Sequence, residues 1–217
     1  MILNVVQTKT SFNMEWVSYL GEDVFSIARS PFEKGRFTIN VEFKNAPGLK
    51  MYYNPSDTTW GSKLADRMSF KLFEGEEKIG SIVGQSKKVG FLKACPYYAY
   101  EYKGTMYYGY EVGFGRKGLY LCVYEGEKLI AIVDKKLRVV NFKDTYTIYL
   151  EDEKYAPVVI PFTLYYDSAT YGDVMEIALV SVEQKWVNTI YKELIAKFDP
   201  AFIPTVLALE EEKNKAT

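Results

Sequence analysis

The sequence predicts a mainly β protein, and two features carry this prediction. Hydrophobic and polar residues alternate with a period of two through the first two thirds of the chain, as in strands that are buried on one face. The 19 tyrosines and 13 phenylalanines are residue types that favour pleated, half-buried surfaces. With 217 residues, 48% of them hydrophobic, the chain can bury a substantial core in one domain.

The clearest alternation lies at residues 37–43, where every second residue is apolar. Similar runs lie at residues 68–72, 119–123 and 146–150. Residues 97–112, YYAYEYKGTMYYGYEV, read as a hairpin that turns at Lys103 and Gly104. Because short polar or glycine-bearing turns separate the runs, the pattern predicts an antiparallel meander.

Two stretches of the chain resemble each other, which indicates an internal repeat. FEGEEKIGSIVGQSKK at 73–88 parallels YEGEKLIAIVDKK at 124–136, with a difference of one residue in the turn. Each reads as a hairpin with an acidic-glycine tip. Their spacing of 50 residues, from Lys78 to Lys128, suggests two related β units that close into one barrel or sandwich.

Residues 156–166, APVVIPFTLYY, are apolar on every face. Such a run fits a wholly buried helix and a fully buried strand equally well. Pro157 suits the first turn of a helix, whereas Pro161 would remove a hydrogen bond from the interior of either structure. The residues by themselves leave both assignments open.

Near the C-terminus the hydrophobic period changes. Apolar residues recur every three or four positions, which predicts an amphipathic helix over residues 173–198. Asp173 is expected to cap the start of this helix, and Asp199 with Pro200 to end it. The charged tail from Glu210 onward is expected to fray.

Composition argues against several classes of site. The absence of histidine removes Ser-His and Cys-His nucleophiles and most catalytic zinc sites. Cys95 and Cys122 each stand alone in a strand-like run, so we expect two buried, reduced thiols. The net charge of −1 gives no global attraction to nucleic acid or anionic membranes. No cofactor is expected.

The N-terminus has neither a basic nor a sustained apolar segment, and no stretch reaches the ~20 apolar residues of a membrane span. We therefore expect a cytoplasmic protein, with peripheral membrane association as one alternative.

A longer stretch of the chain carries a resemblance to a known family. Residues 119–171 closely resemble the end of tubby C-terminal-like domains, including bacterial members and the plant LURP-one-related proteins. The shared order is a strand, a turn like that at 125–127, a strand ending in lysine, the opening of a strand at 144–146, and an apolar helix ending in aspartate, here Asp167. Weaker similarity extends back to about Tyr19.

This resemblance implies a closed antiparallel β-barrel of about twelve strands around a central hydrophobic helix, near residues 156–167. It divides the chain into a tubby C-terminal-like barrel, residues 1–171, and an appendage of the same domain, residues 172–217, that holds the C-terminal helix and the tail. The family is related to the phospholipid scramblases, and tubby itself binds membrane phosphoinositides through basic residues. Those contact residues have no position-by-position match in this chain.

The basic ends of the two repeated units are the candidate binding residues. They are Lys87, Lys88, Lys135, Lys136 and Arg138. If the two units are related by barrel symmetry, these side chains would lie side by side and form a site for an anion or a lipid headgroup. The alternative is that lysines at strand ends serve solubility and protect sheet edges.

Three further patterns have plainer structural explanations. GFGRKG at 113–118 matches a dinucleotide fingerprint only formally, because a strand follows it rather than a helix. The acidic pairs at 76–77 and 151–153 read as solvated loops rather than as an acid and base for catalysis. The aromatic run at 97–110 holds a single basic residue, so cross-strand packing explains it better than nucleic-acid stacking.

Taken together, the sequence predicts a non-enzymatic binding domain that recognises anionic lipid headgroups or a membrane surface. The alternative is a protein-interaction module that uses the helix at 173–198, and an enzyme is a distant third. No nucleic-acid partner is expected.

Overall fold

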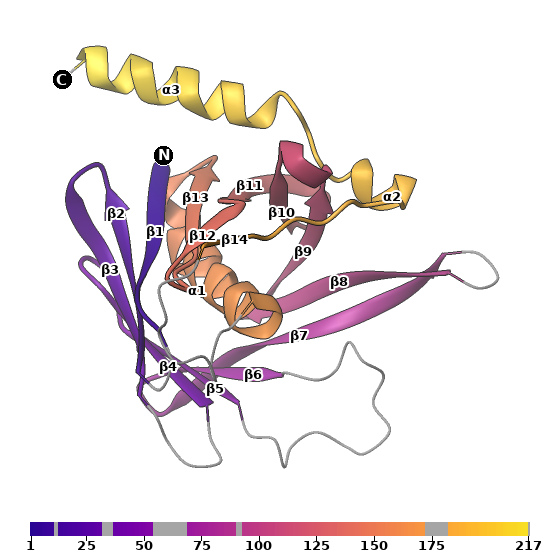
Figure 1. The fold of residues 1–217 in the computed structure, drawn as a ribbon. Helices are drawn as coiled ribbons and strands as arrows, with labels where there is room; N and C mark the ends of the chain where they lie inside the picture. Colours follow the sequence, from indigo (N-terminus) through magenta and orange to yellow (C-terminus); the bar gives the residue numbers. More distant parts are fainter. Residues whose placement is uncertain (11–12, 32–36, 54–68, 90–92, 172–181, 217) are drawn as a thin grey trace.

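The computed structural model describes residues 1–10, 13–31, 37–53, 69–89, 93–171 and 182–216. Its strands close into one antiparallel barrel in the order β1-β13-β11-β10-β9-β8-β7-β6-β5-β4-β3-β2 (Figure 1). The barrel strands are β1 (Ile2–Lys9), β2 (Met14–Leu20), β3 (Asp23–Ser30), β4 (Phe37–Phe43), β5 (Leu49–Tyr53), β6 (Phe70–Glu74), β7 (Glu77–Val89), β8 (Lys93–Tyr102), β9 (Thr105–Gly113), β10 (Leu119–Glu125), β11 (Lys128–Lys135) and β13 (Thr145–Leu150). The predicted mainly β meander is confirmed.

Turn residues explain why neighbouring strands pair in this register. The strands β8 and β9 meet at a two-residue turn in which Lys103 and Gly104 have φ of 48° and 80°, as a tight hairpin turn requires. The repeated hairpins β6–β7 and β10–β11 turn at Gly75 and Gly126, each with φ of 59°. Both also carry an irregularity at matching places in the ladder, so the two repeated stretches have the same local geometry.

The apolar run that followed the barrel strands is a helix, α1 (Ala156–Tyr166), preceded by a 3₁₀ turn at Glu153–Tyr155 and followed by a π-helical turn at Asp167–Tyr171. Pro157 lies in the first turn, where its missing N–H has no helical partner to lose. Every residue of α1 except Pro157 is buried. Its side chains belong to the same core cluster as the inward-facing residues of the strands.

Aromatic contacts and one glycine bring α1 and the strands together. The ring of Phe162 lies edge-on to Tyr100, with 5.4 Å between the ring centroids. Tyr165 packs in the same manner on Phe70, at 5.5 Å. A Cβ on Gly109 of β9 would lie 2.5 Å from the Phe162 ring. Only glycine at this position lets the strand approach α1 so closely.

The C-terminal region differs from the sequence prediction. Residues 182–191 form no helix; they begin with β14 (Val182–Gln184), which pairs with β12 (Arg138–Val140) in a separate two-stranded sheet. A short helix, α2 (Lys192–Ile195), follows. The predicted helix over 173–198 is therefore wrong for residues 182–191, and α2 is the described part of that range that is helical. Its expected cap, Asp173, lies outside the described residues.

The helix was predicted wrongly because a helix and a strand can share the same spacing of apolar residues. A spacing of four residues keeps side chains on one face of a helix, but it also keeps them on one face of a strand. Trp186 and Ile190 are exposed, whereas Val187 and Thr189 between them are half-buried, which is the alternation of an extended chain.

The tail was also predicted wrongly. Helix α3 (Phe202–Ala216) runs through the charged residues that were expected to fray, and it lies across the barrel next to the N-terminus (Figure 1). The amino group of Met1 lies 3.3 Å from the carboxylate of Glu210. Asp199 does not end a helix, since α2 ends at Ile195. Its carboxylate instead accepts a hydrogen bond from the backbone N–H of Ala201, 2.9 Å away, just before α3 begins.

A candidate aromatic groove and a buried polar network

A groove of about 690 Å³ runs along the outer wall of the barrel, between the β7–β8 ribbon and α2. The β7–β8 side contributes Lys87, Cys95 and Pro96, and the opposite side contributes Glu193, Leu194 and Lys197. Tyrosines of β8 and β9 line it as well. This volume is within the range typical of ligand pockets, about 300–1,000 Å³.

Three tyrosines form the aromatic part of the groove. Tyr97 stacks on Tyr110 with 6.1 Å between the ring centroids and an angle of 28°, and it lies 6.2 Å from the ring of Tyr108. The hydroxyl of Tyr97 donates to the side-chain oxygen of Gln85, 2.5 Å away. These rings are only half-buried, so they offer flat faces with polar edges.

Strand alternation explains why these tyrosines face outward. In the hairpin β8–β9, Tyr98, Tyr100 and Tyr107 point into the core with α1, and the residues next to them necessarily point out. The sequence interpretation of this stretch as cross-strand packing is correct on both faces, because Tyr100 packs on Tyr107 inside and Tyr97 packs on Tyr110 outside. The groove beside the outer rings was missed, although tyrosines at both odd and even positions were a signal that the hairpin would be aromatic on both sides.

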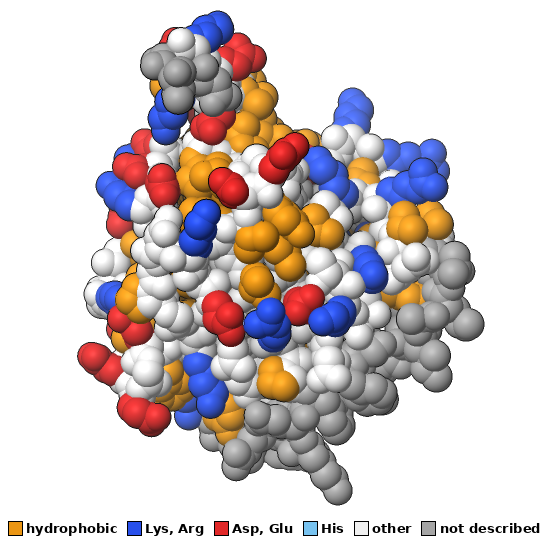
Figure 2. All heavy atoms as spheres, turned by 90° about the vertical axis from the view of Figure 1, so that its left-hand side faces the viewer, with side chains coloured by type: hydrophobic (Ala, Val, Ile, Leu, Met, Phe, Trp, Pro, Cys, Tyr) orange, Lys and Arg blue, Asp and Glu red, His pale blue; other side chains and the backbone are white. Residues whose placement is uncertain are grey.

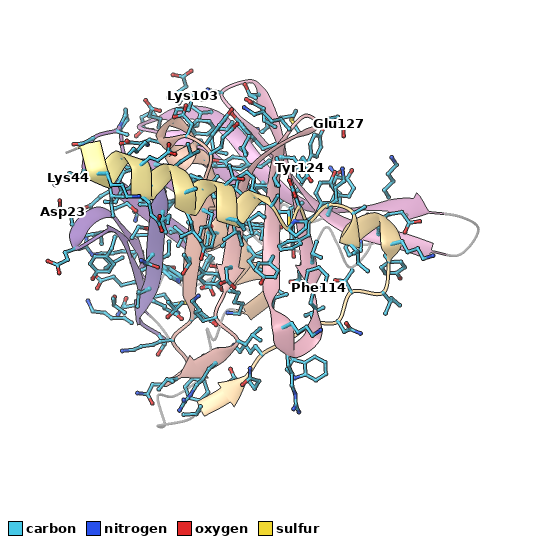
Figure 3. The ribbon with its side chains drawn as sticks, turned by 90° about the horizontal axis from the view of Figure 1, so that it is seen from above. Asp23, Lys44, Lys103, Phe114, Tyr124 and Glu127 are labelled. Atoms are coloured by element: carbon cyan, nitrogen blue, oxygen red, sulfur yellow. The ribbon has the colours of Figure 1, made fainter. Side chains whose placement is uncertain are left out.

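Lys197 places a positive charge against the tyrosines. Its ammonium lies 4.8 Å from the ring centroids of both Tyr110 and Tyr124, within the range of cation–π attraction. The hydroxyl of Tyr124 donates to the backbone carbonyl of Lys197, 2.8 Å away. Burial raises the pKa of Tyr124 to about 12, so this donor keeps its proton. Figure 3 shows Tyr124 close to the linker between α2 and α3.

The C-terminal segment that bounds the groove is docked on the barrel. Phe198 packs on Tyr120 and Phe114, with centroid distances of 4.7 and 5.2 Å. At the GFGRKG stretch, a Cβ on Gly113 would lie 2.2 Å from the carbonyl oxygen of Val187. Gly113 therefore admits the C-terminal segment, and β10 follows this stretch as the sequence predicted.

Among the basic residues predicted as an anion site, those whose side chains the structure describes do not form one patch. Lys87 lies on β7, whereas Lys135 ends β11, and three strands, β8, β9 and β10, separate β7 from β11. Lys87, Lys136 and Arg138 are exposed. The side chain of Lys88 lies outside the described part of the structure.

Lys135 is a clear correction, because its side chain is fully buried. Inward-facing positions of a barrel strand alternate with outward ones, and Lys135 falls on the inner face together with Val133. Its ammonium forms an ion pair with Asp144 and donates to the hydroxyl of Tyr146, 3.1 Å away. This lysine is not available to a ligand at the surface.

Lys135 belongs to a buried polar network at the end of α1. The carboxylate of Asp167 accepts hydrogen bonds from the indole N–H of Trp16, at 2.9 Å, and from the hydroxyl of Tyr146, at 2.5 Å. Burial raises the pKa of Asp167 to about 6, and the neighbouring charge of Asp144 adds to the effect, while Lys135 opposes it. Burial lowers the pKa of Lys135.

This network joins distant parts of the chain. Asp167 follows α1, Trp16 lies on β2, and Tyr146 lies on β13. Asp144 extends the network to the C-terminal segment, because Lys185 lies 3.7 Å from its carboxylate. Asp144, Tyr146 and Asp167 are landmarks of the sequence resemblance, which gave their order but not their contacts. The arrangement suits positioning of α1 and of the C-terminal segment.

The two cysteines and the acidic pairs lie in the surroundings that the sequence predicted. Cys95 and Cys122 are buried, free thiols, as expected. The acidic residues at 76–77 and 151–153 are exposed, which agrees with their interpretation as solvated loops. Within the described ranges, no cluster of three metal-ligating residues occurs, and no helix is long and apolar enough to cross a membrane.

The fold defines this chain as a mainly β protein built on a closed antiparallel barrel. Comparisons with protein-family models, with curated proteins and with solved structures find no match.

Proposed function

We propose that this chain is a non-enzymatic binding domain whose ligand lies in the aromatic groove between the β7–β8 ribbon and α2. The observation that carries the proposal is the set of half-buried tyrosine rings at the groove, Tyr97, Tyr108 and Tyr110, with charged side chains around them. Concave sites with apolar or aromatic walls and a few polar groups are the usual form of a ligand site.

The composition of the groove favours a short peptide segment as the ligand. Tyrosines give large, rigid contact areas at low cost in conformational entropy, and they dominate many protein-binding surfaces. Charges of both signs, Lys87 on one side and Glu193 on the other, suit a chain with mixed side chains. A lipid headgroup would call for a site of one sign.

The contacts inside the barrel favour a ligand site on its outer wall rather than in its interior. In this proposal α1 runs through the barrel and fills it, as its buried residues and its shared core cluster with the strands suggest. The ionisable groups beside α1 are bonded to one another, as in the pair of Lys135 with Asp144. A small molecule would have to displace these contacts to bind inside.

We also propose that the chain belongs with the tubby C-terminal-like domains. Supporting this are the closed barrel of twelve strands, the all-round apolar α1, and the aspartate that follows it, Asp167. A cytoplasmic location fits this proposal.

Recognition of a membrane surface is a second candidate. On the face shown in Figure 2, Lys and Arg side chains gather toward one margin, while both signs of charge mix over the rest. Lys136 and Arg138 are exposed, although Lys136 already pairs with Asp134 at 3.1 Å. Salt-sensitive co-sedimentation with anionic liposomes, lost when Lys136 and Arg138 are both changed to Glu, would favour this candidate over the groove.

The groove is tested by selecting peptides from a displayed random library on the purified chain. Peptides enriched by the unchanged protein should not be enriched by a Tyr97→Ala/Tyr108→Ala variant. Tyr149→Ala is the matched control, because Tyr149 is a half-buried tyrosine on the outer wall at β13. No enrichment, or enrichment that survives the double substitution, would contradict the proposal.

A further inference from the structure

One edge of β14 pairs with β12, and no described strand pairs with its other edge. The backbone N–H of Lys185 donates to the carbonyl of Leu137, 2.8 Å away, beside the ladder with β12. Successive N–H groups of a strand point to opposite edges. The backbone groups of Val182, Gln184 and Trp186 therefore point away from β12, and no described residue hydrogen-bonds to them.

This edge lies at the surface and carries apolar side chains. Val182 is 55% exposed and Trp186 is 52% exposed. Figure 3 shows β14 as the pale yellow arrow at the margin of the molecule, outside β12. An exposed strand edge with apolar neighbours is a template for pairing with another chain.

The sequence of this edge is complementary to itself. If two copies of VEQKW at 182–186 pair in antiparallel fashion about a two-fold axis at Gln184, Val182 of one copy faces Trp186 of the other. The same register sets Glu183 opposite Lys185. Facing residues of opposite charge and facing apolar residues both stabilise antiparallel pairs.

Neighbouring registers lack this match. A two-fold axis at Glu183 or at Lys185 would set two like charges directly opposite each other, which destabilises a pair. The axis at Gln184 also makes Gln184 exchange both backbone hydrogen bonds with its symmetry mate, because its N–H and C=O point to the free edge.

We propose that two copies of this chain associate through β14, forming a four-stranded antiparallel sheet in the order β12-β14-β14-β12. The contact is isologous, as expected of a two-fold dimer. It buries Val182 and Trp186 of both copies and leaves the aromatic groove as it is, so it is independent of the proposed ligand.

The test is the mass of the full chain as a function of concentration, measured by sedimentation equilibrium. The mass should rise from 25.0 kDa toward twice this value between micromolar and near-millimolar concentration. Val182→Glu and Trp186→Lys should each keep the chain monomeric. The double variant, Val182→Glu/Trp186→Lys, should dimerise again, because each new carboxylate faces a new ammonium across the axis.

Two further variants complete the test: one is a control, and the other removes a backbone hydrogen-bond donor. Ile190→Glu is the control, because Ile190 is 75% exposed and lies outside the paired residues; its mass should follow that of the unchanged chain. Gln184→Pro removes an N–H that points away from β12 and should abolish dimerisation without loss of thermal stability. A chain that stays monomeric throughout, single variants that still dimerise, or a double variant that does not would overturn the proposal.

Discussion

Replacing Gly109 with alanine tests the packing of α1 against the barrel. The added Cβ would lie 2.5 Å from the Phe162 ring and 3.1 Å from a methyl of Leu121, and Phe162 is held by its edge-on contact with Tyr100. Overpacking of this kind costs about 1–3 kcal/mol. For a chain of this size, each kcal/mol lowers the melting temperature by about 2–4 °C, so we expect a loss of about 2–12 °C.

The assay is thermal unfolding followed by circular dichroism, with urea unfolding as the second measure of stability. Gly48→Ala is the control, because Gly48 is exposed and its nearest neighbour, the Val41 carbonyl oxygen, is 3.4 Å from the new Cβ. Phe162→Leu should remove part of the clash. The double variant, Gly109→Ala/Phe162→Leu, should therefore lose about 0.5–3 kcal/mol less unfolding free energy than the two single variants lose in sum. Additive losses, or a Gly109→Ala variant as stable as the control, would refute the packing described.

Three other predictions follow from the network and from the docked C-terminal segment. Because the folded pKa of Asp167 is raised from 3.8 to about 6, the folded chain binds this proton more tightly, and the stability due to this group should fall as pH rises from about 4 to 6. Urea titrations across this range should show that Asp167→Asn lacks this downward contribution; identical slopes for both proteins would contradict it. Trp16→Phe leaves an oxygen of Asp167 without its donor and should cost about 1–3 kcal/mol in urea unfolding, whereas Trp186→Phe at the surface should be nearly neutral. Gly113→Val should displace the segment at Val187 and speed its cleavage in limited proteolysis, and unchanged cleavage would argue against docking there.

The strands could be predicted because their evidence is local. Alternation fixes which side of a strand is buried. Glycine marks a turn in the sequence because it readily adopts a positive φ, as Gly75 and Gly126 do. The repeated hairpins were visible in the sequence for the same reason. Residues 156–166 were undecided, because an all-apolar run has no period, and only the surrounding structure selects the helix.

The C-terminal region was predicted wrongly because apolar residues four apart fit both the period of a helix and the period of a strand. The extended form of 182–191 depends on partners far away in the chain, such as Leu137 and Gly113, which accept hydrogen bonds from its backbone. No property of the segment itself reveals those partners.

The candidate site was predicted only in fragments. The tyrosines of 97–110 were recognised, but their contact with Lys197 joins residues about ninety positions apart, which a linear pattern does not show. Lys135 was expected at the surface because most lysines lie there. Its burial follows from the inward side of β11 and from its partner Asp144.

The most direct test of the proposed function is the affinity of the strongest selected peptide, measured by fluorescence anisotropy. Binding to Tyr97→Ala/Tyr108→Ala should be weaker than binding to the unchanged chain by about tenfold or more, because aromatic anchors carry much of the energy of such contacts. Tyr149→Ala should bind as the unchanged chain does. Equal affinity for the unchanged chain and the double variant would show that the peptide binds elsewhere and would contradict the groove as the site.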